Sequence, residues 1–284
     1  MNNFSYSYED IIRLLPERNE NSNKGSCGRV LIIGGSTCMA GAPYFSAKAA
    51  YRTGCGLVEI FTHEDNRVIL QTLIPEAVMS TWSDKIDFEK LENSIKKADV
   101  IAIGMGLSTS DKALEILKFT LQKRTCPIII DADALNLIAE NKDLFELVKG
   151  NAIITPHPLE MSRISGVDVK EITSNIPEFA QNFANENGLI CVLKDHHTAV
   201  SNPNSDSIYI NQSGNSGMST GGSGDVLDGI IAGLLAQGCT PYIAATLGVY
   251  IHGLAGDIAS EILSQYSLMA SDIIDALPEA FTNL

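Results

Sequence analysis

Short, nearly wholly apolar runs alternate with longer helix-like segments between residues 29 and 193. Strands of this kind are buried on both sides, as in a mostly parallel sheet that carries helices on both faces. The pattern therefore predicts an α/β fold with three layers: helices, a central sheet, and helices again. The predicted strands are Arg29–Gly34, Leu57–Phe61, Asp99–Ile103, Pro127–Asp131, Asn151–Ile154 and Ile190–Leu193.

The rest of the chain fits the same plan. Helices are predicted at 43–53 and 111–123, and the pattern from 226 to 280 is almost entirely helical. Residues 198–211 predict a hairpin that turns at Asn-Pro-Asn. Because no Pro/Gly/Ser-rich linker divides the chain, residues 1–284 are predicted to form a single domain, with 1–28 as an N-terminal lead-in.

The excess of acidic residues limits the kinds of molecule that the protein can bind. Twenty Lys and Arg against 34 Asp and Glu give a formal net charge of −14, which argues against nucleic acid or an anionic membrane as the main partner. The six cysteines are scattered, with no CxxC pair, as in a reducing compartment. No signal pattern and no uninterrupted apolar stretch of about 18 residues is present. We therefore expect a soluble, cytoplasmic protein.

Polar and glycine-rich loops follow several of the predicted strands. In open parallel sheets, ligands bind outside the carboxyl ends of the strands, where such loops lead into helices. The candidate loops are Gly34–Ser36, Gly104–Gly106, Asp131–Asp133 and Thr155–Pro158.

The strongest local signal is the segment from Gly214 to Gly238, GNSGMSTGGSGDVLDGIIAGLLAQG, which holds eight of the 23 glycines. Its first half is a glycine-rich loop with hydroxyl groups, and its second half is an apolar helix. Such a loop directs backbone N–H groups into one concavity at the positive end of the helix dipole. The segment therefore predicts an anion site, most plausibly for phosphate. It matches neither the P-loop, because no GK[ST] follows, nor the G-x-G-x-x-G dinucleotide fingerprint.

Asp225 lies where this loop enters the helix, and two interpretations are open. It could be an N-cap beside a tight glycine turn. Alternatively, it could face a substrate hydroxyl next to the phosphate and act as the base in phosphoryl transfer. The second interpretation makes Asp225 the candidate catalytic residue.

Three other segments carry candidate chemistry. Lys194 and Thr198, after a buried strand, could hold the phosphates or the adenosine portion of a nucleotide. A metal site at His196 and His197 is disfavoured, because adjacent residues on a strand point to opposite faces. His157 could contact substrate or be a structural histidine bonded to the backbone. Asp131 and Asp133 could bind Mg²⁺ or cap a helix at 134–139.

Taken together, these segments resemble the ADP/ATP-dependent NAD(P)H-hydrate dehydratases of the ribokinase-like superfamily. The resemblance covers nearly the whole chain, and its specificity comes from the ordered set of motifs. The motifs are GRVLIIGGS at 28–36, GAPYFSAKAAYRTGCGLV at 41–58, DADALN at 131–136, ITPHPLEM at 154–161 and NSGMSTGGSGDVLDGIIAGLLAQG at 215–238.

This resemblance implies a repair enzyme for hydrated nicotinamide cofactors, NADHX and NADPHX. ADP or ATP would phosphorylate the ring hydroxyl, and loss of phosphate would restore the double bond, with Mg²⁺ accompanying the phosphates through ligands that the sequence does not identify. It places Ala42, Gly106, His157 and Asp225 at the hydrated dinucleotide. For the adenine nucleotide it implies Lys194, Asp195, His196, His197, Thr198, Gly222, Ser223 and Gly224. It also implies a homo-oligomer, a tetramer.

The sequence departs from the family pattern in places. KDHHT at 194–198 stands where the family more usually has KGxxT, so Asp195 adds a side chain and a charge where glycine would let the backbone approach the nucleotide. GGSGD replaces the more usual GGTGD and keeps the hydroxyl. Two other functions remain open: a ribokinase-like kinase of a small hydroxymethyl vitamin precursor, and a non-catalytic regulatory protein that binds adenine nucleotides.

Overall fold

Ten strands form one sheet in the computed structural model, which describes residues 2–18 and 20–284. The sheet order is β1-β10-β9-β8-β7-β6-β5-β2-β3-β4. All neighbours from β8 to β4 are parallel, β9 is antiparallel to β8 and β10, and β1 is parallel to β10. The strands are β1 (Asn2–Phe4), β2 (Arg29–Ile33), β3 (Leu57–His63), β4 (Val78–Trp82), β5 (Val100–Ile103), β6 (Ile128–Ile130), β7 (Ala152–Ile154), β8 (Ile190–Leu193), β9 (Ala199–Ser201) and β10 (Ser207–Ile210).

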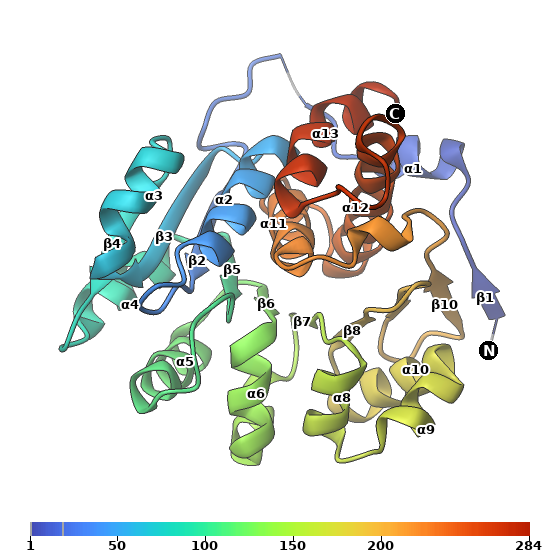
Figure 1. The fold of residues 1–284 in the computed structure, drawn as a ribbon. Helices are drawn as coiled ribbons and strands as arrows, with labels where there is room; N and C mark the ends of the chain where they lie inside the picture. The colour runs from blue at the N-terminus through green and yellow to red at the C-terminus, as the bar shows by residue number, and fades with distance from the viewer. Residues whose placement is uncertain (1, 19) are drawn as a thin grey trace.

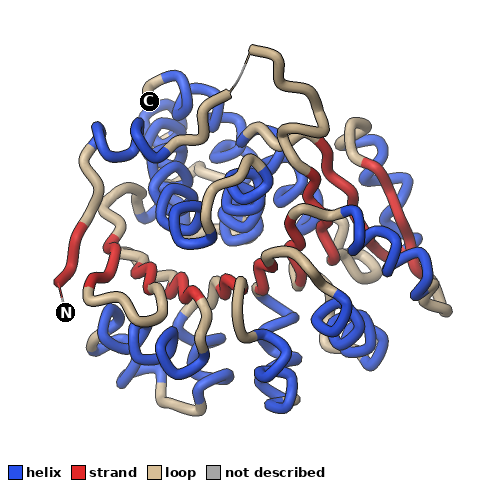
Figure 2. The backbone as a smooth tube through the Cα atoms, turned by 180° about the vertical axis from the view of Figure 1, so that it is seen from behind, coloured by secondary structure: helices blue, strands red, loops and turns tan. Residues whose placement is uncertain are grey.

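Helices cover both faces of this sheet, as Figures 1 and 2 show. One face carries α1 (Tyr8–Leu14), α2 (Gly41–Thr53), α11 (Ser223–Ala236), α12 (Pro241–Leu263) and α13 (Ala270–Thr282). The other helices are α3 (Arg67–Leu73), α4 (Phe88–Lys97), α5 (Asp111–Lys123), α6 (Ala132–Glu140), α7 (Phe145–Val148), α8 (Pro158–Ser165), α9 (Val169–Ser174) and α10 (Ile176–Asn187). All of these except α3 lie on the opposite face; α3 packs near β4, and its buried Leu70 belongs to the same core as α2 and α11. The predicted three-layer, mostly parallel α/β architecture is confirmed.

The alternation within one strand shows why both faces are covered. Val30 and Ile32 of β2 belong to the core beneath α2, α11 and α12, whereas Leu31 and Ile33 belong to the core on the other side. All four side chains are fully buried. A strand with both faces apolar therefore needs a helical layer on each side.

Several predicted boundaries need correction. The lead-in at 1–28 contains α1 and the edge strand β1, neither of which was predicted, and β4 at the other edge was missed as well. Gly34 and Asp131 lie just beyond their strands, and β3 continues to His63. The hairpin at 198–211 is confirmed as β9 and β10.

Helix α12 is long and apolar enough, by composition, to cross a membrane. However, 61% of its most apolar window is buried inside the protein, and it packs against α11 and α13. Burial of this kind is what a core helix shows.

Helices α2 and α11 approach closely because small residues face each other along the contact. A Cβ added at Gly229 of α11 would lie 2.2 Å from the carbonyl oxygen of Ser46 and 2.8 Å from the Cβ of Ala49. One turn later, a Cβ at Gly233 would lie 2.8 Å from the Cβ of Thr53. The two glycines therefore set the spacing between the helices.

We expect Gly229→Ala to destabilise the protein by about 1–3 kcal/mol, the usual cost of overpacking a core. Alanine's better helix propensity, about 1 kcal/mol, offsets part of this cost. Chemical denaturation followed by circular dichroism measures the change. Gly221→Ala is the control, because a Cβ there meets nothing within 4 Å. An unchanged or raised stability of Gly229→Ala would show that glycine does not limit the helix spacing.

Candidate functional site

Three polar side chains follow three neighbouring strands at the carboxyl edge of the sheet. Asp131 follows β6, Thr155 follows β7 and Lys194 follows β8, and these strands are adjacent and parallel. All three lie against the first turns of α11, since the Thr155 hydroxyl bonds Asp228 and a Cβ at Gly224 would lie 3.3 Å from Lys194 Nζ and 3.6 Å from Asp131 Oδ2. This edge is where an open α/β sheet binds its ligands.

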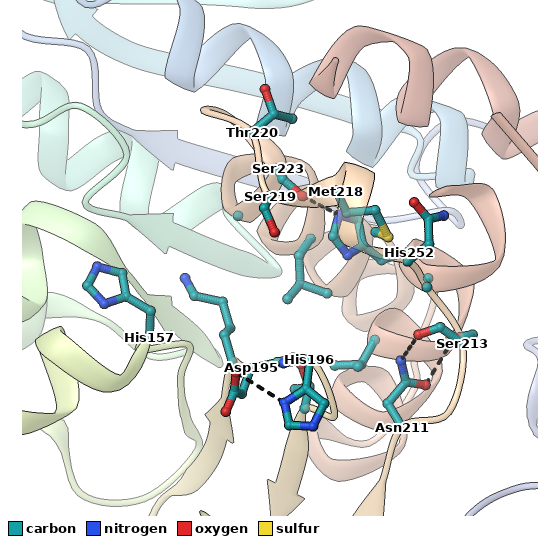
Figure 3. A pocket seen from close by; sticks show the side chains of 18 of the residues that line it. His157, Asp195, His196, Asn211, Ser213, Met218, Ser219, Thr220, Ser223 and His252 are labelled. Atoms are coloured by element: carbon teal, nitrogen blue, oxygen red, sulfur yellow. Dashed lines mark hydrogen bonds and ion pairs between the residues drawn. The ribbon is translucent and has the colours of Figure 1, made fainter. Parts of the chain in front are cut away.

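A cavity of about 870 Å³ opens beside these residues (Figure 3). The glycine-rich loop before α11, the turn after β8, and His252 of α12 line it. All the positions predicted for the nucleotide lie in this lining: Lys194, Asp195, His196, His197, Thr198, Gly222, Ser223 and Gly224. The structure thus brings together two segments that are about thirty residues apart in the chain.

The glycine-rich loop enters α11 through Gly222, whose φ of 92° is left-handed and favours glycine. A Cβ at this position would also lie 2.7 Å from the ring of Phe45. In the described part of the chain, no side chain caps the N-terminus of α11. The first N–H groups of a helix lack intrahelical partners, so this end is suited to an anion.

Asp225 lies in the first turn of α11 and lines the cavity. Burial, together with the negative charge of Asp131, raises the pKa of Asp225 to about 7. The N-cap interpretation of Asp225 is wrong, because Gly222 occupies the cap position. A carboxyl group with a pKa near neutrality is suited to accept a proton at the pH of the cell.

Lys194 and Asp131 form an ion pair in which the Nζ–Oδ1 distance is 2.8 Å. Burial alone would lower the pKa of Lys194, but the negative charge of Asp131 raises it above its usual value. The ammonium group is close to the start of α11, since a Cβ added at Gly224 would lie 3.3 Å from Nζ. Lys194 is the one Lys or Arg among the described residues that line the cavity.

The two carboxylates predicted either to bind Mg²⁺ or to cap a helix do not cap α6 with their side chains. Asp131 precedes α6 but makes no side-chain cap hydrogen bond, because it pairs with Lys194. The Asp133 carboxylate accepts a hydrogen bond of 2.7 Å from the backbone N–H of Ser108. Within residues 2–18 and 20–284, no three His, Cys, Asp or Glu side chains are grouped as a metal site requires.

His157 makes the backbone hydrogen bonds of a structural histidine and also lines the cavity. Its Nδ1 accepts hydrogen bonds from the N–H groups of Leu159 and Glu160 at the start of α8. Its side chain nevertheless remains 46% exposed and lines the cavity. Burial, and then the positive charge of Lys194, lowers its pKa, so the ring is neutral at pH 7.

The turn after β8 is held by its own contacts. The Asp195 carboxylate accepts a hydrogen bond from the N–H of His196 and lies 3.4 Å from its Nδ1, as Figure 3 shows. The Thr198 hydroxyl donates to the Asp195 carbonyl. The extra carboxylate at Asp195 therefore folds back onto the turn.

His252, which lies in the middle of α12, was not predicted as a site residue. Its Nε2 is 3.2 Å from the Ser223 hydroxyl at the start of α11. Burial lowers the pKa of His252 to about 4, so the ring is neutral. A single histidine in an apolar helix was its only signal, and that signal does not reveal its partner.

Ala42 and Gly106 do not line the large cavity in the described structure. They lie beside each other above β2 and β5, since a Cβ at Gly106 would be 3.2 Å from the Cβ of Ala42. From β2 the chain continues to β3 on one side, and from β5 it continues to β6 on the other side. Ala42 and Gly106 therefore lie at the topological switch point, where such folds bind ligands.

Ser46 connects this switch point to the first turn of α11. Its hydroxyl lies 3.4 Å from the Ala42 carbonyl and 2.9 Å from the Asp225 carbonyl, and it donates to both. The candidate substrate residues and the candidate nucleotide residues thus meet at Asp225.

Comparison with known proteins identifies relatives over nearly the whole chain. The sequence profile of a family described as NAD(P)H-hydrate dehydratase matches residues 30–279. The bifunctional NAD(P)H-hydrate repair enzyme Nnr of Moorella thermoacetica is 39% identical over 280 residues, which are 95% of this chain and 52% of the relative. The chain therefore spans about half the length of this relative.

Two crystal structures are similar throughout. A ribokinase-like superfamily protein of Enterococcus faecalis has a TM-score of 0.89 and 31% identity, with 99% of this chain and 96% of that chain covered. The ADP/ATP-dependent NAD(P)H-hydrate dehydratase of Bacillus subtilis, co-crystallised with ATP and Mg²⁺, has a TM-score of 0.84 and 30% identity, with 98% of each chain covered.

Proposed function

Because the chain belongs to the NAD(P)H-hydrate dehydratase family, we propose that it restores NADH and NADPH from NADHX and NADPHX at the expense of ADP or ATP. The observation that carries this proposal is the position and protonation of Asp225. It lies between the nucleotide-sized cavity and the switch point, with a pKa near neutrality.

The proposed reaction has two steps. Asp225 accepts the proton of the ring hydroxyl while the hydroxyl oxygen attacks the terminal phosphorus of ADP or ATP. The bond from that phosphorus to the rest of the nucleotide breaks, and AMP or ADP leaves. The C–O bond to the new phosphate then breaks, driven by the lone pair of the ring nitrogen. Breakage of this bond releases inorganic phosphate, and the phosphate takes a proton from the neighbouring ring carbon, which restores the double bond.

We assign the residue roles from the family resemblance and from the positions of the residues around the cavity. Backbone N–H groups at Gly222, Ser223 and Gly224 would stabilise negative charge on the transferred group, and Lys194 would supply the positive charge. Ala42, Gly106 and His157 would contact the hydrated dinucleotide.

We also propose that Mg²⁺ enters with the nucleotide. The cavity lining carries four carboxylates (Asp131, Glu160, Asp195 and Asp225). Phosphates therefore need a further counter-charge there, but no preformed metal cluster exists among the described residues. Phosphate oxygens, retained waters and one or two carboxylates are expected to supply the ligands, as is common for Mg²⁺.

The cellular setting is likewise a proposal. The acidic balance of 34 Asp and Glu against 20 Lys and Arg supports a cytoplasmic protein that binds neither nucleic acid nor membrane. The family resemblance supports a homo-oligomer, and sedimentation analysis would test the expected tetramer.

The test follows the near-ultraviolet absorbance of the dihydronicotinamide ring, which the hydrates lack. Purified protein is mixed with NADHX or NADPHX, Mg²⁺, and either ADP or ATP. A nucleotide-dependent rise is expected, with inorganic phosphate released in equal amount, and chelation of Mg²⁺ should abolish it. Nucleotide consumption with a stable phosphorylated product would instead indicate a kinase. Nucleotide binding without consumption would indicate a regulatory protein.

A further inference from the structure

Asp228 is a carboxyl group for which the proposed reaction has no use. It lies on α11 one turn after Asp225, and its side chain is fully buried. The hydroxyl of Thr155, which is also fully buried, donates a hydrogen bond of 2.9 Å to its Oδ1. Burial of a carboxyl group at such a position is costly unless it is paired or neutral.

The second oxygen of Asp228 lacks a hydrogen-bond donor. Its Oδ2 is buried and unpartnered among the described residues. Lys194, the nearest positive group, is already bonded to Asp131 at 2.8 Å. As an acceptor, this oxygen would therefore be left unsatisfied.

Asp131 offers the complementary group. Its carboxylate faces the same part of α11, since a Cβ at Gly224, one turn before Asp228, would lie 3.6 Å from the Asp131 Oδ2. Burial, together with the negative charge of Asp131, raises the pKa of Asp228 well above the usual range. A proton on Oδ2 turns that oxygen into a donor, and a carboxylate such as Asp131 is the acceptor that it needs. One proton shared in a hydrogen bond would therefore give both buried carboxyl groups a partner.

We propose that Asp228 is a positioning residue: as a neutral carboxylic acid, it links Thr155 to Asp131 and so fixes the Asp131–Lys194 pair at the start of α11. Its importance for turnover rests on the proposed function. Lys194 is the cation beside Gly224, where the transferred phosphoryl group would lie. If Asp131 were free to rotate, Lys194 would be held less accurately against that group.

Substitutions at Asp228 distinguish this role from simple filling of space. In Asp228→Asn, the amide N–H₂ can donate to Asp131 and the amide oxygen can accept from Thr155. We expect kcat within about twofold of wild type for this variant. Asp228→Ala removes both bonds, and we expect its kcat to fall roughly tenfold or more, with a smaller change in the KM for ADP.

Two results would overturn the proposal. One is an alanine variant that folds and turns over like wild type. The other is an asparagine variant that folds like wild type but is as slow as the alanine variant. Thermal denaturation establishes folding for each. Asp228→Asn also serves as the rescue, because a folded, active asparagine variant shows that hydrogen bonding rather than charge is needed.

A second measurement does not depend on activity. Carbon-13 labelling of aspartate carboxyl groups allows the Asp228 resonance to be assigned by its absence from the asparagine variant. In the intact protein, with Asp131, Lys194 and Thr155 around it, we expect this resonance at the position of a protonated acid at neutral pH. A carboxylate shift would refute the neutral acid. If the protein fails to convert NADHX while the resonance is that of the acid, the proposed function fails and the linkage stands.

Discussion

Asp225→Asn is expected to lower nucleotide-dependent turnover of NADHX by about 10²–10⁴-fold, the usual contribution of a general base. The amide keeps the shape of the side chain but cannot accept the proton of the ring hydroxyl. The affinity for ADP should stay within a few-fold, because backbone N–H groups and Lys194 provide the contacts with phosphate. Calorimetric titration with ADP and the absorbance assay measure the two quantities separately.

The chain offers a matched control for this variant. Asp228→Asn makes the same substitution one turn further along α11 and is expected to retain turnover. Equal activity of Asp225→Asn and wild type would remove Asp225 from its role as base. Equal loss in both variants would show that α11 does not tolerate asparagine in this region.

The same carboxyl group predicts a dependence on pH. With a pKa raised to about 7, Asp225 is an active base only above that pH, so kcat/KM should rise through pH 7 and the rise should be missing from Asp225→Asn. Stability should show the opposite trend. Between about pH 4 and 7 the native state binds more protons than the unfolded state, so this group lowers stability as pH rises. At pH 8, Asp225→Asn should be more stable by up to about 4 kcal/mol.

Lys194→Met is the second variant with a large expected effect. It removes the positive charge that Asp131 binds at 2.8 Å and that faces the start of α11. We expect turnover to fall at least about 100-fold, since charge stabilisation at the transferred group is lost. Stability should fall by about 2–4 kcal/mol, because Asp131 is left as a buried, unpaired carboxylate.

A double variant separates these two effects. In Lys194→Met/Asp131→Asn the unpaired charge is gone, so much of the stability should return while turnover stays low. Chemical denaturation and the absorbance assay test both parts, and the difference from additivity gives the coupling of the pair. Unchanged stability in the single variant would show that the ion pair contributes nothing to folding.

The central strands and the loops that follow them could be predicted from sequence, because a strand buried on both faces is apolar throughout. The edge strands were harder to predict from the sequence. Strand β4 contains Ser80 and Thr81, and Ser80 bonds the buried Glu59, so its pattern is not that of an apolar run. Strand β1 has three residues and exists through its pairing with β10. The local sequence of β4 does not reveal Glu59, and that of β1 does not reveal β10.

In the candidate site, too, local sequence patterns could be predicted and long-range contacts could not. The glycine-rich loop and the turn after β8 have recognisable local patterns, so their residues could be assigned to one ligand. The bonds of Lys194 to Asp131, 63 positions away, and of Thr155 to Asp228, 73 positions away, depend on how three strands and a helix pack. His252 and Asp228 acquire their chemistry only from those long-range contacts.

The close packing of α2 against α11 has a mechanical consequence. Ala42 lies in the first turn of α2 and Asp225 in the first turn of α11, and small residues and the Ser46 hydroxyl lock the two helices together. One of these turns would hold the nicotinamide ring, and Asp225 would deprotonate the hydroxyl of that ring. The two groups therefore move together as one rigid unit. Any closure around the bound pair of substrates must therefore come from other segments that line the cavity, such as the turn at 194–198.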